Sequence, residues 1–206
     1  MVRKTQERDA AMTELEKLKK GLYYNSRSEE IGNYNIKVKE KLHYYNQLPQ
    51  TRKAEREAIL RSLFGSLGKN PYIENTFQCD MGFNLHAGDN LYCNHNCVFL
   101  DCAPITIGDD VLFGPNVGIY TPEHAFDPLI RKAGWEHSLP VTIGDRVWVG
   151  GSVTILGGVT IGSDTIIGAG SVVTHDIPSG VIAVGNPCRV LRVITEEDKR
   201  IHAPQE

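Results

Sequence analysis

Apolar residues recur at every sixth position over the C-terminal two thirds of the chain. The longest run joins Ile143, Val149, Ile155, Ile161, Ile167 and Val173. A second set of small or β-branched residues follows four positions later, at Val147, Val153, Val159, Thr165 and Ser171. Shorter runs come earlier, at Ile107, Phe113 and Ile119 and, more weakly, at Ala87, Cys93 and Phe99. A period of six fits neither a helix nor a strictly alternating strand, so it predicts short strands separated by corners and stacked around one apolar column.

The positions between these apolar residues carry residue types that favour turns. Glycine directly follows several of them, as at Gly144 and Gly150, and the predicted corners contain Asp109, Asp110, Asn116, Asp145, Ser163 and Asp164. Short polar side chains of this kind adopt or stabilise turn conformations more readily than others. The pattern therefore predicts a mainly β fold, a solenoid of parallel strands.

The first 70 residues have a helical pattern instead. Residues 5–20 read as an amphipathic helix with Met12, Leu15 and Leu18 on its apolar face, and Gly21 ends it. Two further helices are expected at about 33–46 and 51–67, with Pro49 and Pro71 breaking the pattern after each. We therefore expect a helical module over residues 1–70, the repeats over 71–192 and a short tail over 193–206.

The six-residue repeat is interrupted once, between Ile119 and Ile143. We expect residues 120–140 to form a loop that leaves the solenoid and returns to it. Long loops on rigid scaffolds are commonly functional, so this segment is the first place to look for chemistry.

The composition narrows the classes of partner. A net charge of −3 gives no strong positive field for nucleic acid or an anionic membrane. No apolar run approaches the length of a membrane span, and the N-terminus lacks the apolar core of a secretory signal. The five cysteines are odd in number and do not suggest a disulfide framework. We expect a cytoplasmic protein.

Several short motifs resemble one family. They are Gly21-Leu-Tyr-Tyr24, Phe77-Gln-Cys-Asp-Met-Gly-Phe-Asn84, Asn94-His-Asn-Cys-Val-Phe-Leu-Asp101, Tyr120-Thr-Pro-Glu-His124 and Gly185-Asn-Pro-Cys-Arg189. Together with the repeat, they resemble the maltose and galactoside O-acetyltransferases of the hexapeptide-repeat class, across essentially the whole chain. The resemblance implies a left-handed parallel β-helix with an N-terminal α-helical segment. It also implies acetyl-CoA as co-substrate, a sugar hydroxyl as acceptor, and a homotrimer with each active site between two subunits.

The resemblance also implies roles for individual residues. His124 matches the catalytic histidine, and Trp148 a tryptophan that lines the active site, although Trp148 could equally cover a corner of the coil. Asp80, Tyr92 and Asn94 fall where the sugar is bound. Acetyl-CoA would contact Asn94, Gly151, Ala169, Thr174, His175, Arg189 and Arg192. Asn25, Asn35 and Cys102 stand where the galactoside enzymes have an Asp, an Arg and a further Asp, which puts the identity of the acceptor in question.

The implied reaction suits these residue types. An alcohol must lose its proton as it attacks a thioester, and histidine ordinarily titrates near neutrality. A backbone N–H at the Gly150–Gly151 corner could stabilise the oxyanion, because glycine allows close approach. Holding the two substrates in contact supplies much of the remaining rate. We expect direct transfer in a ternary complex, with no metal and no covalent enzyme intermediate.

Three other functions compete with this one. An antibiotic hydroxyl could replace the sugar, or the solenoid could be a non-catalytic assembly or binding module. A zinc-dependent carbonic anhydrase would need three histidines at one place, whereas His86 and His95 lie half a coil apart. The cluster of Cys93, His95, Cys97 and Cys102 lacks the usual zinc spacing. Cys93 and Cys97 also fall on inward repeat positions, so we interpret them as core residues.

Overall fold

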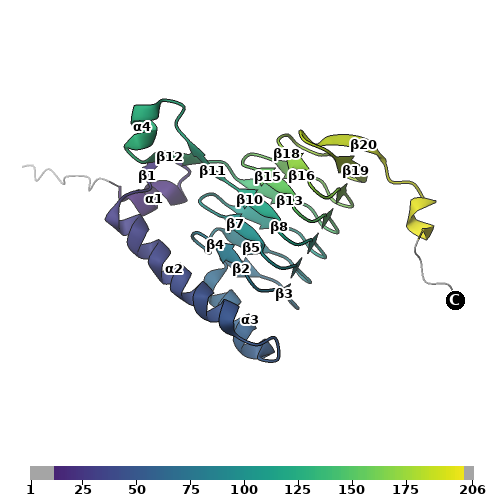
Figure 1. Cartoon of the computed structure of the whole chain (residues 1–206), viewed down its shortest axis with the longest axis horizontal. Coiled ribbons are helices and arrows are strands. Elements are labelled where there is room, and N and C mark those ends of the chain that lie inside the picture. The colour runs from purple at the N-terminus through teal and green to yellow at the C-terminus, as the bar shows by residue number, and fades with distance from the viewer. Residues whose placement is uncertain (1–11, 202–206) are drawn as a thin grey trace, which may run out of the picture.

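The computed structural model describes residues 12–201. Its centre is a column of stacked triangular coils, each contributing one short strand to each of three sheets (Figure 1). Face 1 contains β2 (Ser66–Leu67), β5 (Leu85–Ala87), β8 (Ile105–Ile107), β13 (Val141–Ile143) and β16 (Thr160–Ile161). Face 2 contains β3 (Tyr72–Ile73), β6 (Tyr92–Cys93), β9 (Leu112–Phe113), β14 (Trp148–Val149), β17 (Ile166–Ile167), β19 (Val181–Val184) and β20 (Arg189–Val193). Face 3 contains β4 (Gln78–Cys79), β7 (Val98–Leu100), β10 (Gly118–Tyr120), β15 (Thr154–Leu156) and β18 (Val172–Val173).

The two sets of repeat positions fill the interior of the column, as predicted. Ile155, Ile161 and Ile167 are fully buried, and so are the hydroxyl-bearing residues Thr165 and Ser171. Both hydroxyls are satisfied, since Thr165 donates to the carbonyl of Pro178 and Ser171 to that of Gly168. Buried polar groups that keep a partner avoid the cost of desolvation. The core interpretation of Cys93 and Cys97 is also confirmed, because both are fully buried.

Two of the three edges of the column carry most of the candidate site residues. The excursion edge joins face 3 to face 1 and comprises residues 80–84, 101–104, 121–140, 157–159 and 174–176. The asparagine edge joins face 2 to face 3 and comprises residues 74–77, 94–97, 114–117, 150–153 and 168–171. The first two coils have extra residues at the excursion edge, which explains why their six-residue pattern is weaker.

Polar ladders hold the corners together. At the edge between face 1 and face 2, the Asp109 carboxylate accepts the N–H of Asp89, and the Asp145 carboxylate accepts that of Asp109. The following residue, Asp110, has a φ of 58°, and Asp164 has a φ of 59° in a later coil. This left-handed conformation is one that Asp and Asn adopt more readily than other non-glycine residues. The turn chemistry predicted for these corners is therefore what the structure uses.

Between residue 12 and the solenoid, the structure has three helices. α1 (Glu14–Lys19) begins after Thr13, whose hydroxyl and the Glu16 carboxylate form a capping box. Leu18 is buried and Leu15 half-buried, but Met12 lies before the helix and is 40% exposed, so its predicted place in the apolar stripe is wrong. Residues 5–11 of that predicted helix lie outside the described residues.

The other two helices form a hairpin against the first coil. α2 (Glu29–Gln47) starts earlier than predicted because Ser28 caps it. α3 (Lys53–Leu63) ends earlier than predicted, because Ser66–Leu67 already pairs with β5 as the first strand of the solenoid. The start of the solenoid therefore lies before residue 71. No helix in the part of the chain described here is long and apolar enough to cross a bilayer.

The helical hairpin and the solenoid share one hydrophobic core. Val38, Leu42 and Leu60 belong to the same buried cluster as the inward residues of the coils. At the opposite end, β20 folds back antiparallel on β19, and a short 3₁₀-helix, η1 (Asp198–Arg200), follows it (Figure 1). The helical hairpin therefore covers one end of the column, and the β19–β20 hairpin lies at the other.

Candidate active site

The segment that interrupts the repeat is an ordered hairpin. β11 (Pro122–His124) and β12 (Trp135–Ser138) pair antiparallel, and α4 (Pro128–Lys132) lies at the tip between them. Asp127 caps α4 by accepting two backbone N–H bonds, and Pro128 occupies the first turn. On its other side β12 pairs with β1 (Tyr24–Asn25), so the hairpin and the N-terminal module form one three-stranded sheet (Figure 1).

His124 is the last residue of β11, and its side chain is 61% exposed. Its cross-strand partner is Glu136, and His124 Nδ1 lies 3.5 Å from Glu136 Oε1. A carboxylate beside Nδ1 favours the tautomer that leaves Nε2 free to accept a proton. No sequence signal pointed to Glu136, because only the register of the hairpin brings it opposite His124.

His124 lines the first of two adjoining hollows. The first has a volume of about 130 Å³ and is lined by Tyr23, Glu123, His124, Ala125, Phe126 and His137. The second has a volume of about 540 Å³, is mainly apolar and is lined by Tyr23, Ala125, Phe126, Asp127, Ile130 and Trp135. The Tyr23 and His137 rings lie 4.9 Å apart between centroids. The hollow next to the imidazole is therefore the smaller one, and the larger hollow adjoins it through Tyr23, Ala125 and Phe126.

Asp80 lies at the excursion edge, where two coils have extra residues. Its carboxylate accepts a weak bond from the Cys102 thiol, with 3.6 Å between Oδ2 and Sγ. Burial raises the pKa of Asp80 above its ordinary value. Asp101 shapes this corner, because its Oδ1 accepts the backbone N–H groups of Asp80 and Met81. Cys102, which stands in place of a carboxylate, is thus a buried donor to Asp80 and has little surface to offer a ligand.

The two asparagines of the N-terminal module differ in their availability. Asn25 is committed to the fold, since its amide donates to the carbonyl of Ala133 and its Oδ1 accepts the N–H of Arg27. Asn35 lies on α2, and its Oδ1 is enclosed without a hydrogen-bond partner among the described residues. Asn25 therefore connects the N-terminal module to the hairpin, whereas the Oδ1 of Asn35 is buried without a hydrogen bond from residues 12–201.

A second group of expected residues lies on face 2 and at the asparagine edge. Tyr92 stacks on Tyr72 with 5.8 Å between ring centroids, and Trp148, further along the same row of face 2, is 53% exposed. Asn94, Gly151 and Ala169 lie at the corners of three coils. The N–H groups of Gly151 and Ala169 have no acceptor within residues 12–201. Unpaired backbone donors of this kind can bind carbonyl oxygens of a ligand.

The last expected residues meet at the end of the column. His175 and Arg189 line one hollow of about 300 Å³, together with Cys188. Thr174 is hydrogen-bonded to His175, with 2.8 Å between Oγ1 and Nδ1. Arg192 differs, because its guanidinium makes a two-point ion pair with Asp198. Its charge is therefore engaged within the chain.

One chain does not bring these groups together. Asp80 and His124 belong to the excursion edge, whereas Asn94 and Gly151 belong to the asparagine edge, with face 3 between them. None of the expected acetyl-CoA contacts lines the two hollows beside His124. Within one chain, face 3 separates the two edges.

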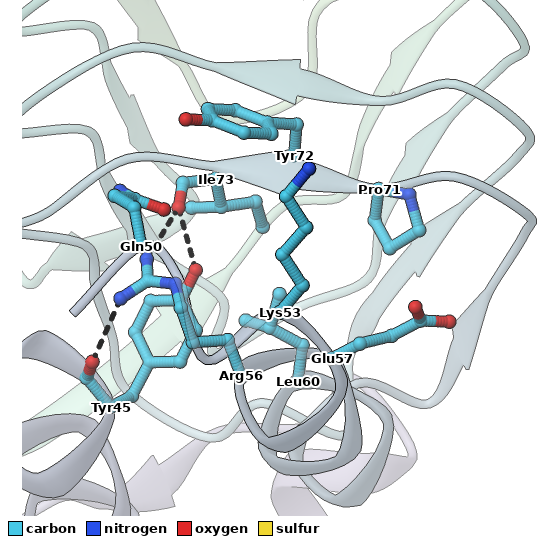
Figure 2. Close-up of a pocket in the computed structure, with 9 residues that line it drawn as sticks. All are labelled: Tyr45, Gln50, Lys53, Arg56, Glu57, Leu60, Pro71, Tyr72 and Ile73. Carbon is cyan, nitrogen blue, oxygen red and sulfur yellow. Dashed lines mark hydrogen bonds between the residues drawn. The ribbon is translucent and has the colours of Figure 1, made fainter. Parts of the chain in front are cut away.

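Another hollow, of about 140 Å³, lies between the helical hairpin and the first coil, as Figure 2 shows. Arg56 is 4% exposed there, and its guanidinium donates to the carbonyls of Tyr45, Leu48 and Ile73. It also lies 4.1 Å from the centre of the Tyr45 ring. The Arg56 guanidinium is engaged in hydrogen bonds that join α3 to α2 and β3. We therefore interpret this hollow as part of the packing interface between the helical hairpin and the first coil, and not as a ligand site.

The structure places the two histidines of the competing zinc hypothesis, His86 and His95, apart. His86 lies on face 1 beside Ser66, and His95 lies at the asparagine edge beside the carbonyl of Asn75. Within residues 12–201, no group of three or more His, Cys, Asp or Glu side chains is arranged to hold a metal ion.

Three family models match the chain. They are the maltose acetyltransferase hexapeptide capping motif at residues 17–68, the hexapeptide repeat of succinyl-transferase at 104–122, and the bacterial transferase hexapeptide at 140–175. The chain is 37% identical to galactoside O-acetyltransferase of Escherichia coli (strain K12), over 91% of this chain and 92% of that protein.

Solved structures agree with the sequence matches. A maltose O-acetyltransferase from Clostridium difficile 630 is 47% identical and superposes with a TM-score of 0.87, over 90% of this chain and 100% of that chain. A hexapeptide-repeat acetyltransferase from Vibrio cholerae O1 biovar eltor, complexed with acetyl coenzyme A, is 40% identical with a TM-score of 0.82, over the same shares. The predicted left-handed parallel β-helix with an N-terminal α-helical segment is confirmed. The chain belongs to the maltose and galactoside O-acetyltransferase family and is an acetyltransferase of the hexapeptide-repeat class.

Proposed function

We propose that this acetyltransferase moves the acetyl group of acetyl-CoA to a hydroxyl of a sugar, with His124 as general base. The observation that carries the proposal is that His124 lines the smaller of two adjoining hollows, with its Nδ1 3.5 Å from Oε1 of Glu136. Nε2 is then the nitrogen that takes the proton from the acceptor hydroxyl. The oxygen attacks the thioester carbonyl, and coenzyme A leaves as the thiol.

Charge develops in two places during this transfer. The imidazole becomes an imidazolium, which the Glu136 carboxylate stabilises across 3.5 Å. The carbonyl oxygen becomes an oxyanion, and the unpaired N–H of Gly151 is the donor we assign to it. Both groups are held by the backbone of the hairpin or the coil, so little reorganisation accompanies the reaction. No covalent enzyme intermediate is required.

We place acetyl-CoA along the asparagine edge. The free N–H groups of Gly151 and Ala169, one coil apart, suit the carbonyl oxygens of the thioester and the pantetheine arm. His175 and Arg189 supply positive charge for phosphate at the end of the column. Arg192 contributes only after it leaves Asp198. The acetyl coenzyme A bound by the Vibrio cholerae relative supports this choice of co-substrate.

We assign the acceptor to the hollows beside His124. Asp80, Tyr92 and Asn94 would bind its hydroxyl groups, with Trp148 lining the site. Asn25 takes no part, because both ends of its amide are used by the fold. The Oδ1 of Asn35 is enclosed, and its amide lacks the charge and the fork of the arginine that stands there in the galactoside enzymes. The names of the maltose and galactoside relatives support a sugar as acceptor.

The same assignment is consistent with the homotrimer that the family resemblance implies. The proposed base lies at the excursion edge, whereas the Gly151 and Ala169 N–H groups proposed for acetyl-CoA lie at the asparagine edge, so we propose that each site combines the excursion edge of one subunit with the asparagine edge of another. The five cysteines are free thiols, which fits a reducing compartment. We therefore propose a cytoplasmic trimer.

The test is release of coenzyme A thiol with acetyl-CoA and a panel of glucosides, galactosides, maltose and antibiotics. We expect sugar-dependent release and a loss of roughly 10²–10⁴-fold in His124→Ala. His43→Ala is the matched control, because His43 is an exposed histidine on α2 bonded to Gln47. Release with antibiotics alone would replace the sugar by another acceptor. Full activity in His124→Ala would remove the base assignment.

A further inference from the structure

One row of side chains crosses the three-stranded sheet that joins the N-terminal module to the hairpin. Tyr24 of β1 is the cross-strand partner of Glu136 on β12, and Glu136 is in turn the partner of His124 on β11. Directly opposed residues of antiparallel strands have neighbouring side chains on one face. The three side chains therefore form a continuous line from the core of the module to the proposed base.

The inner end of this row is rigid. Tyr24 is 1% exposed and packs with Leu18, Ile31 and Met81. Its hydroxyl lies 3.0 Å from Glu136 Oε2 and 3.5 Å from Ser138 Oγ. Burial raises the pKa of the Tyr24 phenol well above its ordinary value, so it stays neutral and donates its proton to the carboxylate. One oxygen of Glu136 is thus fixed by Tyr24 while the other faces His124.

We propose that Tyr24 is a positioning residue for the transfer reaction, acting through Glu136 to hold the imidazole of His124. The proposal rests on the proposed role of His124 as base. Without the phenol, the Glu136 carboxylate can rotate away from Nδ1, and the imidazole loses the partner that fixes its tautomer. The N-terminal module then does more than cover the first coil, because it supplies the inner anchor of the base.

The backbone of β1 is itself fixed on both sides. Glu14 of α1 accepts the N–H of Asn25 at 2.6 Å, and the Asn25 amide donates to the carbonyl of Ala133. Tyr24 therefore has little freedom to follow a displaced Glu136. The other titratable or charged groups around the row are Glu14, Lys17, Tyr23, Arg27, Asp80, Cys102, Glu123, Asp127 and His137.

The test compares Tyr24→Phe with Tyr44→Phe in the full-length enzyme. Tyr44 also donates its phenol to a glutamate, Glu55, but lies at the far end of α2 and is exposed. We expect Tyr24→Phe to lower kcat about tenfold, the order of one hydrogen bond to a charged group. The KM for acetyl-CoA should not change, because the Gly151 and Ala169 N–H groups proposed to bind it lie at the asparagine edge, away from this row. Tyr44→Phe should match the wild type.

A double-mutant cycle then shows whether Tyr24 acts through Glu136. If it does, Tyr24→Phe changes kcat about twofold or less once Glu136 is already Gln. Fully multiplicative losses would overturn the proposal, as would a Tyr24→Phe enzyme with wild-type kcat. A rise in both KM values with kcat unchanged would also overturn it, because that result describes a loosened fold.

A spectroscopic readout separates this proposal from the proposed function. The ¹⁵N signals of the His124 ring, identified by their loss in His124→Ala, report which nitrogen carries the proton. We expect an Nδ1–H tautomer in the wild type and a mixture of tautomers in Tyr24→Phe, with Tyr44→Phe unchanged. Identical tautomers in all three proteins would overturn the role of Tyr24. An altered tautomer in an enzyme that acetylates nothing on the panel would leave the positioning intact and remove the sugar transfer.

Discussion

Asp101 gives the enzyme a stability that depends on pH. The side chain is fully buried, and its Oδ1 accepts two backbone N–H groups while Oδ2 has no partner among the described residues. Burial raises the pKa of Asp101 to about 7, against the two N–H bonds that lower it. In the unfolded chain the same carboxyl titrates near 3.8. The folded state therefore binds this proton more tightly than the unfolded state.

The sign and size of the effect follow from this difference. A raised pKa in the folded state means that the stability is fully present below pH 4 and is lost as the pH rises to about 7. Three pKa steps correspond to about 4 kcal/mol of unfolding free energy. Asp101→Asn keeps an oxygen for the two N–H groups and cannot ionise. We expect Asp101→Asn to remove this pH-dependent part of the unfolding free energy, and the variant to be more stable than the wild type at pH 8.

Denaturant unfolding at pH 5 and pH 8, at one fixed protein concentration, measures the effect. The wild type should lose stability between the two values, and Asp101→Asn should lose markedly less. Glu57→Gln is a suitable control, because it also removes one carboxylate but lies exposed on α3 beside Arg61. Equal pH dependence in wild type and Asp101→Asn would show that the buried carboxyl is already ionised when the protein folds, and the reasoning would fail.

Two further substitutions test other parts of the structure. Arg56→Met leaves the buried carbonyl of Leu48 without its donor and removes one donor each from the carbonyls of Tyr45 and Ile73, so it should lower the unfolding free energy by about 3 kcal/mol in urea. Arg61→Met, on the same helix but exposed, should cost about 1 kcal/mol or less, and equal losses would contradict the buried-seam interpretation. Glu136→Gln should lower kcat about tenfold in the thiol-release assay by removing the charge opposite the imidazolium, with the KM for acetyl-CoA unchanged. A Glu136→Gln enzyme with wild-type kcat would mean that the carboxylate has no part in transfer.

The sequence predicted the scaffold well because the scaffold is repetitive. Each coil buries the same two repeat positions, so the burial of Val153 and Ile155 could be predicted from their spacing alone. The turn residues are equally local, as the left-handed Asp110 and Asn116 show. The helix ends were less accurate, because α3 stops where pairing of Ser66 with His86 begins, and that pairing is set by the solenoid and not by local propensity.

The candidate site was predicted only in part, for a related reason. His124 stood out through its motif, but Glu136 and Tyr24 reach it through strand pairing across the hairpin and across 112 residues of sequence. No periodicity links such positions. The engagement of Asn25 with Ala133 and of Arg192 with Asp198 was hidden too, because both depend on where distant segments dock. The motifs indicated which residues to inspect, but they could not show which of those side chains are already engaged in hydrogen bonds or ion pairs within the chain.

The hairpin at residues 121–140 leaves and re-enters the column without disturbing it. Thr106 before the excursion pairs with Thr142 after it, and the next coil stacks on Thr142 as if nothing intervened. Each strand of the column therefore depends on pairing with the strands of the neighbouring coils, whatever the length of the segment that connects them. A family built this way can lengthen, shorten or rewrite its chemical segment while inheriting the stacked support unchanged. The single break in the repeat is thus the point at which acceptor preference can diverge at the least structural cost.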